Sequence, residues 1–139
     1  MHVNELGLWV QGTFVSASDR NTKDNIRPVD PRAVLDKVAS MPVSEWSYKH
    51  DPSSRHVGPM AQDFRAAFGL GHDDKGIATV DADGVALAAI QGLNEKVEVR
   101  SERAEGRIQK LESENAELKQ RLTDLERLIT NAAQRETRP

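Results

Sequence analysis

The chain has no cysteine among its 139 residues, few aromatic residues and no long apolar run. The lack of cysteine excludes disulfides, thiol catalysis and cysteine-ligated zinc. A membrane-spanning helix needs about 20 consecutive apolar residues, and no segment of the chain is that long. The N-terminus also lacks a signal-peptide pattern, so we expect no membrane partner. The 19 basic and 22 acidic residues give a net charge of −3, which disfavours nucleic acid as a partner. Two Trp, three Phe and one Tyr make a thin core for one chain, which favours burial between chains.

Short strands and helices are predicted over the first 84 residues, an α+β pattern. Asp30 followed by Pro31 is typical of a helix N-cap and first turn, and Gly69 is a helix stop. In chain order we predict a strand at 6–15, in which Leu6, Leu8, Val10 and Phe14 alternate, and a helix from Asp30 to Met41. A strand follows at 43–49, with Trp46 and Tyr48 on one side, and then a turn or loop at 50–55. A helix from Pro59 to Gly69, a loop at 69–76 and a short strand at 77–80 complete this part of the chain. Asp81 or Asp83 is the expected cap of the next helix.

A heptad repeat runs without a break from Leu87 onward. Its apolar positions alternate by three and four residues over seven heptads, which is typical of a coiled coil. The a positions are Leu87, Asn94, Ser101, Ile108, Asn115, Leu122 and Ile129, and the d positions are Ile90, Val97, Ala104, Leu111, Leu118, Leu125 and Ala132. A solvated single helix or an intrachain hairpin would be the alternatives. Apart from Gly92 and Gly106 nothing in 85–134 signals a turn, so a hairpin is disfavoured.

Charges beside the apolar positions favour parallel, in-register helices. In such an arrangement each g residue faces the e residue five positions on in the neighbouring chain. The four pairs of this kind are Arg100 with Glu105, Arg107 with Glu112, Glu114 with Lys119, and Arg121 with Glu126, all of opposite sign. Ile108 at an a position with Leu111 at a d position favours a coiled coil of two helices. Asn115, a polar residue at an a position, fixes the register of the helices more than it adds stability. The heptads alone leave dimer and trimer open.

Ser18 and Lys23 lie five residues apart in a polar stretch, SASDRNTKDNI, that precedes the first predicted helix. A serine becomes a nucleophile when a base takes its proton, and a neutral lysine amine can act as that base. An ordinary lysine has a pKa near ~10.4, so the chemistry requires burial that favours the uncharged amine. Serine and lysine at this separation are common, and an exposed loop with a capping Ser18 or Asp19 is the alternative interpretation.

Several motifs in the right order resemble those of one family, the C-terminal intramolecular chaperone domains of phage endosialidases, tailspikes and tail fibres. The resemblance spans about residues 16–100. Its matching positions are Ser18, Asp19, Lys23, Asn25 and Ile26, then Trp46, then Arg55, His56, Gly58, Ala61 and Gln62. Two positions depart from the family pattern: Thr22 stands where a large apolar residue is expected, and Pro59 follows the glycine where the family has an apolar residue.

The resemblance implies a homotrimer that templates the folding of an upstream β-rich fibre and is then released by cutting itself at the Ala17–Ser18 bond. Ser18 is then the nucleophile and Lys23 the general base, a Ser–Lys peptidase dyad that acts once, in cis. Asp19 and Asn25 are supporting residues, with backbone N–H groups near Asn25 as oxyanion donors. The implied setting is a phage virion precursor assembled in the bacterial host cytoplasm.

His56 is the histidine of most interest, because it lies in the family-like RHVG sequence. It either orients polar groups near Ser18 and Lys23 or makes a structural hydrogen bond. The other histidines lack metal-ligand spacing, and DADG at 81–84 lacks the outer carboxylates of a calcium loop. We therefore expect no metal, cofactor or small-molecule ligand.

These observations predict an α+β fold with three parts. Residues 1–17 are the end of the passenger fibre, 18–84 a small chaperone and auto-processing domain, and 85–139 the helix of a parallel trimeric coiled coil. Two alternative functions stay open: a trimerisation module of the same fold that does not cut, and a coiled-coil adaptor whose small domain binds another protein.

Overall fold

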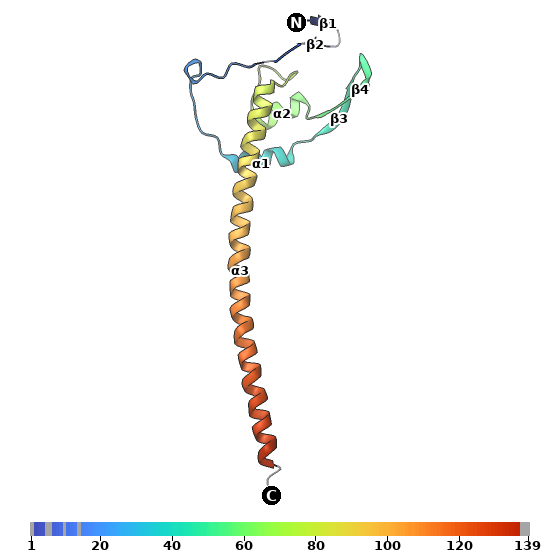
Figure 1. The fold of residues 1–139 in the computed structure, drawn as a ribbon. Helices are drawn as coiled ribbons and strands as arrows, with labels where there is room; N and C mark the ends of the chain where they lie inside the picture. The colour runs from blue at the N-terminus through green and yellow to red at the C-terminus, as the bar shows by residue number, and fades with distance from the viewer. Residues whose placement is uncertain (1, 5–6, 10, 14, 137–139) are drawn as a thin grey trace. The chain divides into compact units, whose positions relative to one another are not determined.

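The computed structural model describes residues 2–4, 7–9, 11–13 and 15–136. The chain forms two compact units, residues 1–95 and 96–139. Figure 1 traces the elements in chain order. They are β1 (His2–Asn4), β2 (Gly7–Trp9), the 3-10 turn η1 (Arg20–Thr22), α1 (Pro31–Ser40), β3 (Ser44–Tyr48), β4 (Asp51–Gly58), α2 (Ala61–Phe68) and α3 (Thr79–Glu136). The fold is α+β, as predicted, with short elements followed by one long helix.

α1 begins where its sequence predicts. The Asp30 side chain accepts hydrogen bonds from the backbone N–H groups of Arg32 and Ala33, at 3.0 and 3.2 Å, and Pro31 occupies the first turn. These bonds satisfy donors that have no partner inside the helix. Val34, Leu35 and Val38 are half-buried along one face, which confirms the predicted apolar stripe.

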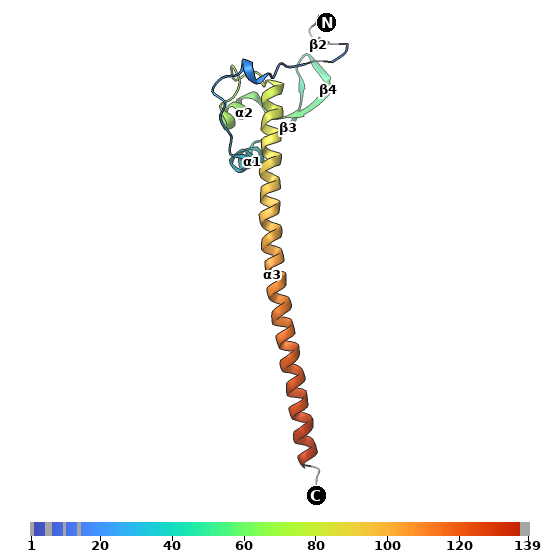
Figure 2. The same cartoon turned by 60° about the vertical axis from the view of Figure 1, so that its left-hand side comes forward.

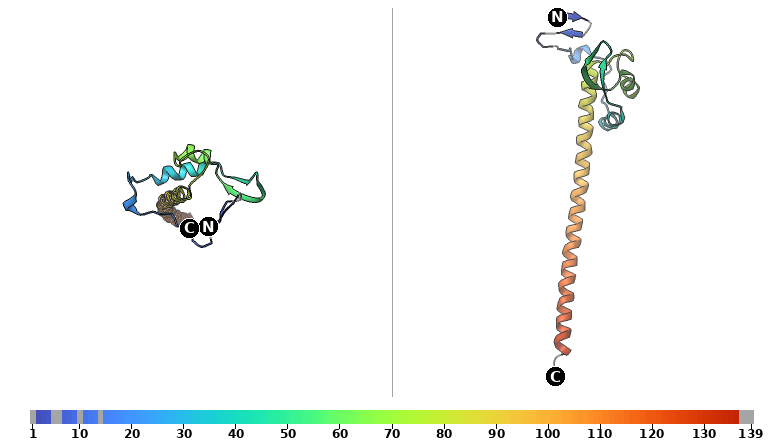
Figure 3. Two further views of the ribbon diagram at one scale, coloured as in Figure 1. Left: turned by 90° about the horizontal axis from the view of Figure 1, so that it is seen from above. Right: turned by 90° about the vertical axis from the view of Figure 1, so that its right-hand side faces the viewer.

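β3 and β4 form an antiparallel hairpin that Figure 3 shows beside the helices. Trp46 pairs with His56, and a register irregularity lies between Trp46 and Tyr48. β3 confirms the predicted strand. The turn or loop predicted at 50–55 is confirmed for His50, which lies in the hairpin turn, and is wrong for residues 51–55, which lie in β4. Pairing along β3 overrides the turn-like composition of this segment, and a two-stranded sheet tolerates Pro52 because each strand has an open edge.

α2 and the start of α3 hold the small core of residues 1–95. Among the described residues, the buried apolar side chains are Phe64, Val85, Ala88 and Ala89. The Phe64 and Phe68 rings lie 5.0 Å apart, and Gly69 ends α2 in the left-handed conformation with φ of 66°. Such a core is thin for a domain, as the shortage of aromatic residues predicts.

Three further predicted boundaries differ from the structure. The strand predicted at 77–80 is wrong: α3 already begins at Thr79, so Asp81 lies in its first turn, where a carboxylate complements the helix dipole. α2 begins two residues after Pro59, with Met60 as its N-cap. The strand predicted at 6–15 is shorter, because β2 ends at Trp9 and residues 11–12 bend; Leu6, Val10 and Phe14 lie outside the described residues.

The start of α1 approaches α3 closely at Gly92. A Cβ atom at Gly92 would lie 2.2 Å from the backbone oxygen of Pro31, a distance that side chains essentially never show. The next residue along, Arg32, donates from Nε to Glu95 of α3 at 2.9 Å. α1 therefore lies backbone to backbone against α3 (Figure 2).

We expect Gly92→Ala to destabilise residues 1–95, because α1 must move to make room for the methyl group. Overpacking of this kind costs about 1–3 kcal/mol. Gly106 also lies at the f position of a heptad, but a Cβ there meets nothing within 4 Å. Gly106→Ala is the matched control and should stabilise the helix by about 0.5–1 kcal/mol. Thermal unfolding followed by circular dichroism measures both shifts, and equal shifts in the two variants would contradict the close approach.

Candidate functional site

Ser18 and Lys23 are in contact. Lys23 Nζ donates a hydrogen bond to Ser18 Oγ at 2.6 Å, across the turn that η1 makes. Both residues are exposed in the single chain. A hydroxyl and an amine at this distance can exchange a proton directly once the amine is uncharged.

Asp19 organises the turn between them. Its carboxylate accepts from the backbone N–H of Asn21 at 2.9 Å and from Asn21 Nδ2 at 3.0 Å, which caps η1. Its backbone carbonyl accepts from Thr22 N at 3.2 Å and from Thr22 Oγ1 at 2.8 Å. Asn21 and Thr22 are not among the predicted site residues, although an Asp with an Asn two positions on is a pattern typical of a capped turn.

Asn25 follows the turn in a left-handed backbone conformation, with φ of 53°. Asparagine adopts this conformation more readily than most residues with a side chain. Its backbone N–H donates to Asp24 Oδ1 at 2.7 Å. An oxyanion at Ala17 would therefore have to displace this carboxylate before it could use the N–H of Asn25.

His56 belongs to a row of rings on the β3–β4 hairpin. Its ring stacks on Trp46 with centroids 4.7 Å apart and meets the edge of Tyr48 at 5.4 Å, and Tyr48 in turn stacks on His50 at 5.1 Å. Trp46 Nε1 is buried and has no hydrogen-bond partner among the described residues. These contacts give His56 a packing role in the hairpin.

Asp51 lies where β4 begins, at the end of the same hairpin. Ser54 and Ser53 donate hydrogen bonds to its carboxylate and hold its pKa below the ordinary value of 3.8. The Ser53 Oγ to Asp51 Oδ1 distance is 2.8 Å. On the outward side of the strands, Arg55 forms an ion pair with Glu45. Hydrogen bonds to its ionised form thus keep Asp51 charged at the hairpin end.

Within the described ranges no three His, Asp or Glu side chains gather in a way that could hold a metal ion. None of the helices in that part of the chain is both long and apolar enough to cross a membrane.

α3 divides its faces between two kinds of contact. Along residues 81–95 the buried positions are Val85, Ala88, Ala89 and Gly92, all at heptad positions b, c and f. Leu87 and Ile90, at a and d, are 64% and 62% exposed. Gly92 on the b, c and f face admits the start of α1, whereas Leu87 and Ile90 on the a and d face stay exposed in the single chain.

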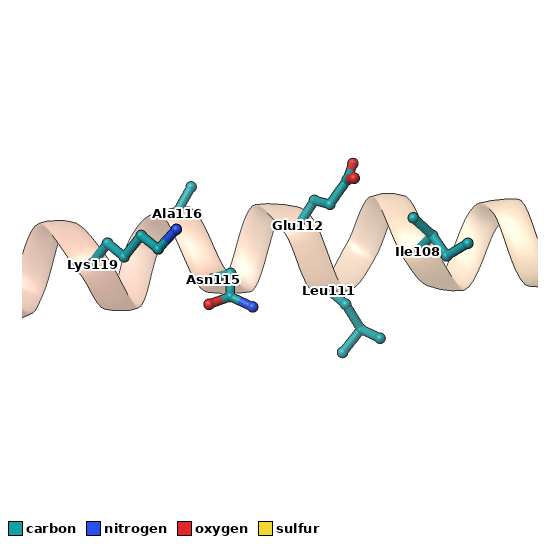
Figure 4. Close-up of a pocket in the computed structure, with 6 residues that line it drawn as sticks. All are labelled: Ile108, Leu111, Glu112, Asn115, Ala116 and Lys119. Carbon is teal, nitrogen blue, oxygen red and sulfur yellow. The ribbon is translucent and has the colours of Figure 1, made fainter.

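Exposed apolar side chains continue along α3 from Val97 to Ile129. They are Val97, Ile108, Leu111, Leu118, Leu122, Leu125 and Ile129. A groove along this part of α3 is lined by Ile108, Leu111, Glu112, Asn115, Ala116 and Lys119, and Figure 4 shows how these side chains lie on the helix. Large exposed apolar faces of this extent mark interaction sites.

The sequence of the chain was compared with models of known protein families. Residues 18–69 match the family model described as chaperone of endosialidase. This match supports an intramolecular chaperone domain over these residues. The match supports a chaperone-type phage function, and the family's name, that of a peptidase family, suggests a self-cleaving peptidase. No curated protein matches the chain.

The chaperone-of-endosialidase match starts at Ser18 and ends at Gly69, the C-cap of α2. It therefore includes the Ser18–Lys23 turn, α1, the β3–β4 hairpin and α2. The resemblance predicted from sequence reached about residue 100, so α3 lies beyond the matched segment.

Proposed function

We propose that the chain is an intramolecular chaperone that trimerises, assists the folding of an upstream phage tail fibre or tailspike, and then cuts itself at Ala17–Ser18. The observation that carries this proposal is the 2.6 Å contact between Lys23 Nζ and Ser18 Oγ. A second observation supports the cut site, since the matched family segment begins at Ser18. The setting would be a phage virion precursor in the bacterial host cytoplasm.

The proposed cut proceeds through an ester. Lys23, as the neutral amine, takes the proton of Ser18 Oγ, and the oxygen attacks the carbonyl carbon of Ala17. The C–N bond then breaks, the Ser18 nitrogen receives the proton from Lys23, and Ala17 is left esterified to Ser18 Oγ. Water adds to this ester and releases a carboxylate on Ala17 and a free amine and hydroxyl on Ser18. The reaction consumes one water and occurs once per chain.

Assembly supplies the environment that the pair lacks in a single chain. Ser18 and Lys23 are exposed there. Burial disfavours a charged ammonium, so cover from neighbouring copies would favour the neutral amine. Cutting would then follow assembly, and the passenger would be released only after three chains had joined.

A second and third copy of the chain are the proposed occupants of the α3 groove. Charge complementarity supports parallel copies in register: Glu112 and Lys119 flank the groove, and the residues that would face them are Arg107 and Glu114. In the single chain Glu114 pairs with Lys110 at 3.7 Å on its own helix. Exposed pairs of this type contribute about 0.3–0.5 kcal/mol, so exchanging them costs little.

The chaperone role follows from the order of folding events. Trimeric β-rich fibres fold slowly because distant segments of three chains must first be brought into register. A coiled coil that joins the chains turns that encounter into an intramolecular one at high effective concentration. Residues 1–17 would be the end of the passenger segment.

Intact mass spectrometry and light scattering on the purified chain test the proposal together. We expect a trimer that has lost residues 1–17. A trimer that retains them would indicate a non-cleaving trimerisation module of the same fold. A monomer or dimer would favour a coiled-coil adaptor.

A further inference from the structure

We propose that Asn21 and Thr22 are positioning residues that hold Ser18 Oγ against Lys23 Nζ. This inference rests on the proposed self-cleavage. The hydrogen bonds of Asn21 and Thr22 within this turn go to Asp19, so both residues act on the reacting pair through Asp19. The geometry that assigns this role is a set of four hydrogen bonds that converge on Asp19.

The bonds link the two ends of the turn. Asp19 is the residue after the nucleophile, and Thr22 is the residue before the proposed base. Thr22 therefore ties Lys23 back to the Ser18 end twice, through its backbone N–H at 3.2 Å and its Oγ1 at 2.8 Å, both to the Asp19 carbonyl. The Lys23 backbone N–H closes the turn by donating to Arg20 O at 3.2 Å.

Packing offers no substitute for these bonds. Every residue from Ser18 to Lys23 is exposed in the single chain, so no core fixes the backbone of the turn. A lysine side chain has several freely rotating bonds, and holding it at one distance from a hydroxyl requires a fixed backbone beneath it. The side-chain bonds of Asn21 and Thr22 supply that fixed backbone.

The Thr22 hydroxyl donates to the Asp19 carbonyl at 2.8 Å, and a substitution can remove this bond without changing the shape of the side chain. The isosteric change Thr22→Val removes the hydroxyl and keeps the shape, whereas Thr22→Ser keeps the hydroxyl and removes the methyl group. The pair of variants separates the hydrogen bond from side-chain bulk. Asn21→Ala removes the second side-chain donor to Asp19.

The test follows the rate at which the full chain loses residues 1–17, by intact mass, with trimer size and thermal midpoint measured alongside. We expect Thr22→Val and Asn21→Ala to cut at least about tenfold more slowly, and Thr22→Ser to cut within about twofold of the unmodified chain. Thr130→Val is the control, because Thr130 Oγ1 makes a bond of the same length, 2.8 Å, to Glu126 O within α3. It should leave the rate unchanged.

Two results would overturn the positioning role: Thr22→Val cutting at the unmodified rate, or Thr22→Ser cutting as slowly as Thr22→Val. An unmodified chain that never cuts would refute the proposed function instead. In that case the inference is judged on the uncut chain by the nuclear Overhauser contact between the Lys23 Hε and Ser18 Hβ protons. Its presence with serine and loss with valine at position 22 supports the inference, and its persistence in both overturns it.

Discussion

Lys23→Arg is expected to leave the chain uncut at Ala17–Ser18. Arginine keeps a positive charge and can still donate to Ser18 Oγ, which Lys23 Nζ reaches at 2.6 Å. It stays protonated in proteins and so cannot take the proton of the hydroxyl. Loss of a general base lowers rates by about 10²–10⁴-fold. Intact mass over several days of incubation measures the effect.

Ser18→Ala removes the attacking oxygen and should abolish the cut as fully as Lys23→Arg, with the trimer intact. The controls are Ser16→Ala, two residues ahead of the nucleophile, and Lys49→Arg, in the turn of the β3–β4 hairpin; both positions are exposed, and neither change should alter the rate. If Lys23→Arg cuts at the unmodified rate, Lys23 is not the base.

Local patterns predicted best those elements that local chemistry determines. Asp30 and Pro31 fix the start of α1, and Gly69 ends α2 in the left-handed conformation that glycine favours. The Ser18–Lys23 contact also lies within six residues, so a single turn is enough to form it. These features depend on neighbours in the sequence, and the sequence displays them directly.

Features that depend on distant partners were predicted poorly. Residues 51–55 look like a loop by composition, and only pairing with β3 makes them part of a strand. From sequence alone, Gly92 is only a residue that destabilises a helix. The structure shows that Pro31, 61 positions earlier, lies so close to Gly92 that a larger residue would not fit there. Nothing local marks either contact, because both arise from the way separate elements pack.

The division of α3 into two faces joins both kinds of information. The heptad pattern identifies the a and d face from sequence alone, whereas only the structure shows that α1 takes the b, c and f face at Gly92. The proposed assembly with further copies of the helix would therefore use a face other than the one that meets Pro31 at Gly92. An intrachain contact on the a and d face would have excluded assembly.

Leu111→Asp should dissociate the assembly. Leu111 is 49% exposed in the single chain and occupies a d position, where each copy would contribute one leucine to the same layer. Burying a leucine contributes about 1.5–3 kcal/mol per chain. The Leu111→Asp change removes this burial energy and also places one aspartate from each copy in the same apolar layer. The aspartates cost several kcal/mol more, because a buried unpaired carboxylate is strongly unfavourable.

Ser113→Asp is the matched control, because residue 113 lies at the f position two residues on and is exposed. Light scattering at micromolar concentration should find Leu111→Asp monomeric and Ser113→Asp trimeric. Circular dichroism should show helix loss in Leu111→Asp alone, since most helical stability in proteins comes from packing of the apolar face. Cutting at Ala17–Ser18 should slow with Leu111→Asp as well, because the Ser18–Lys23 pair is exposed without neighbours. A Leu111→Asp monomer that cuts at the unmodified rate would separate catalysis from assembly and would place the neutral amine within a single chain.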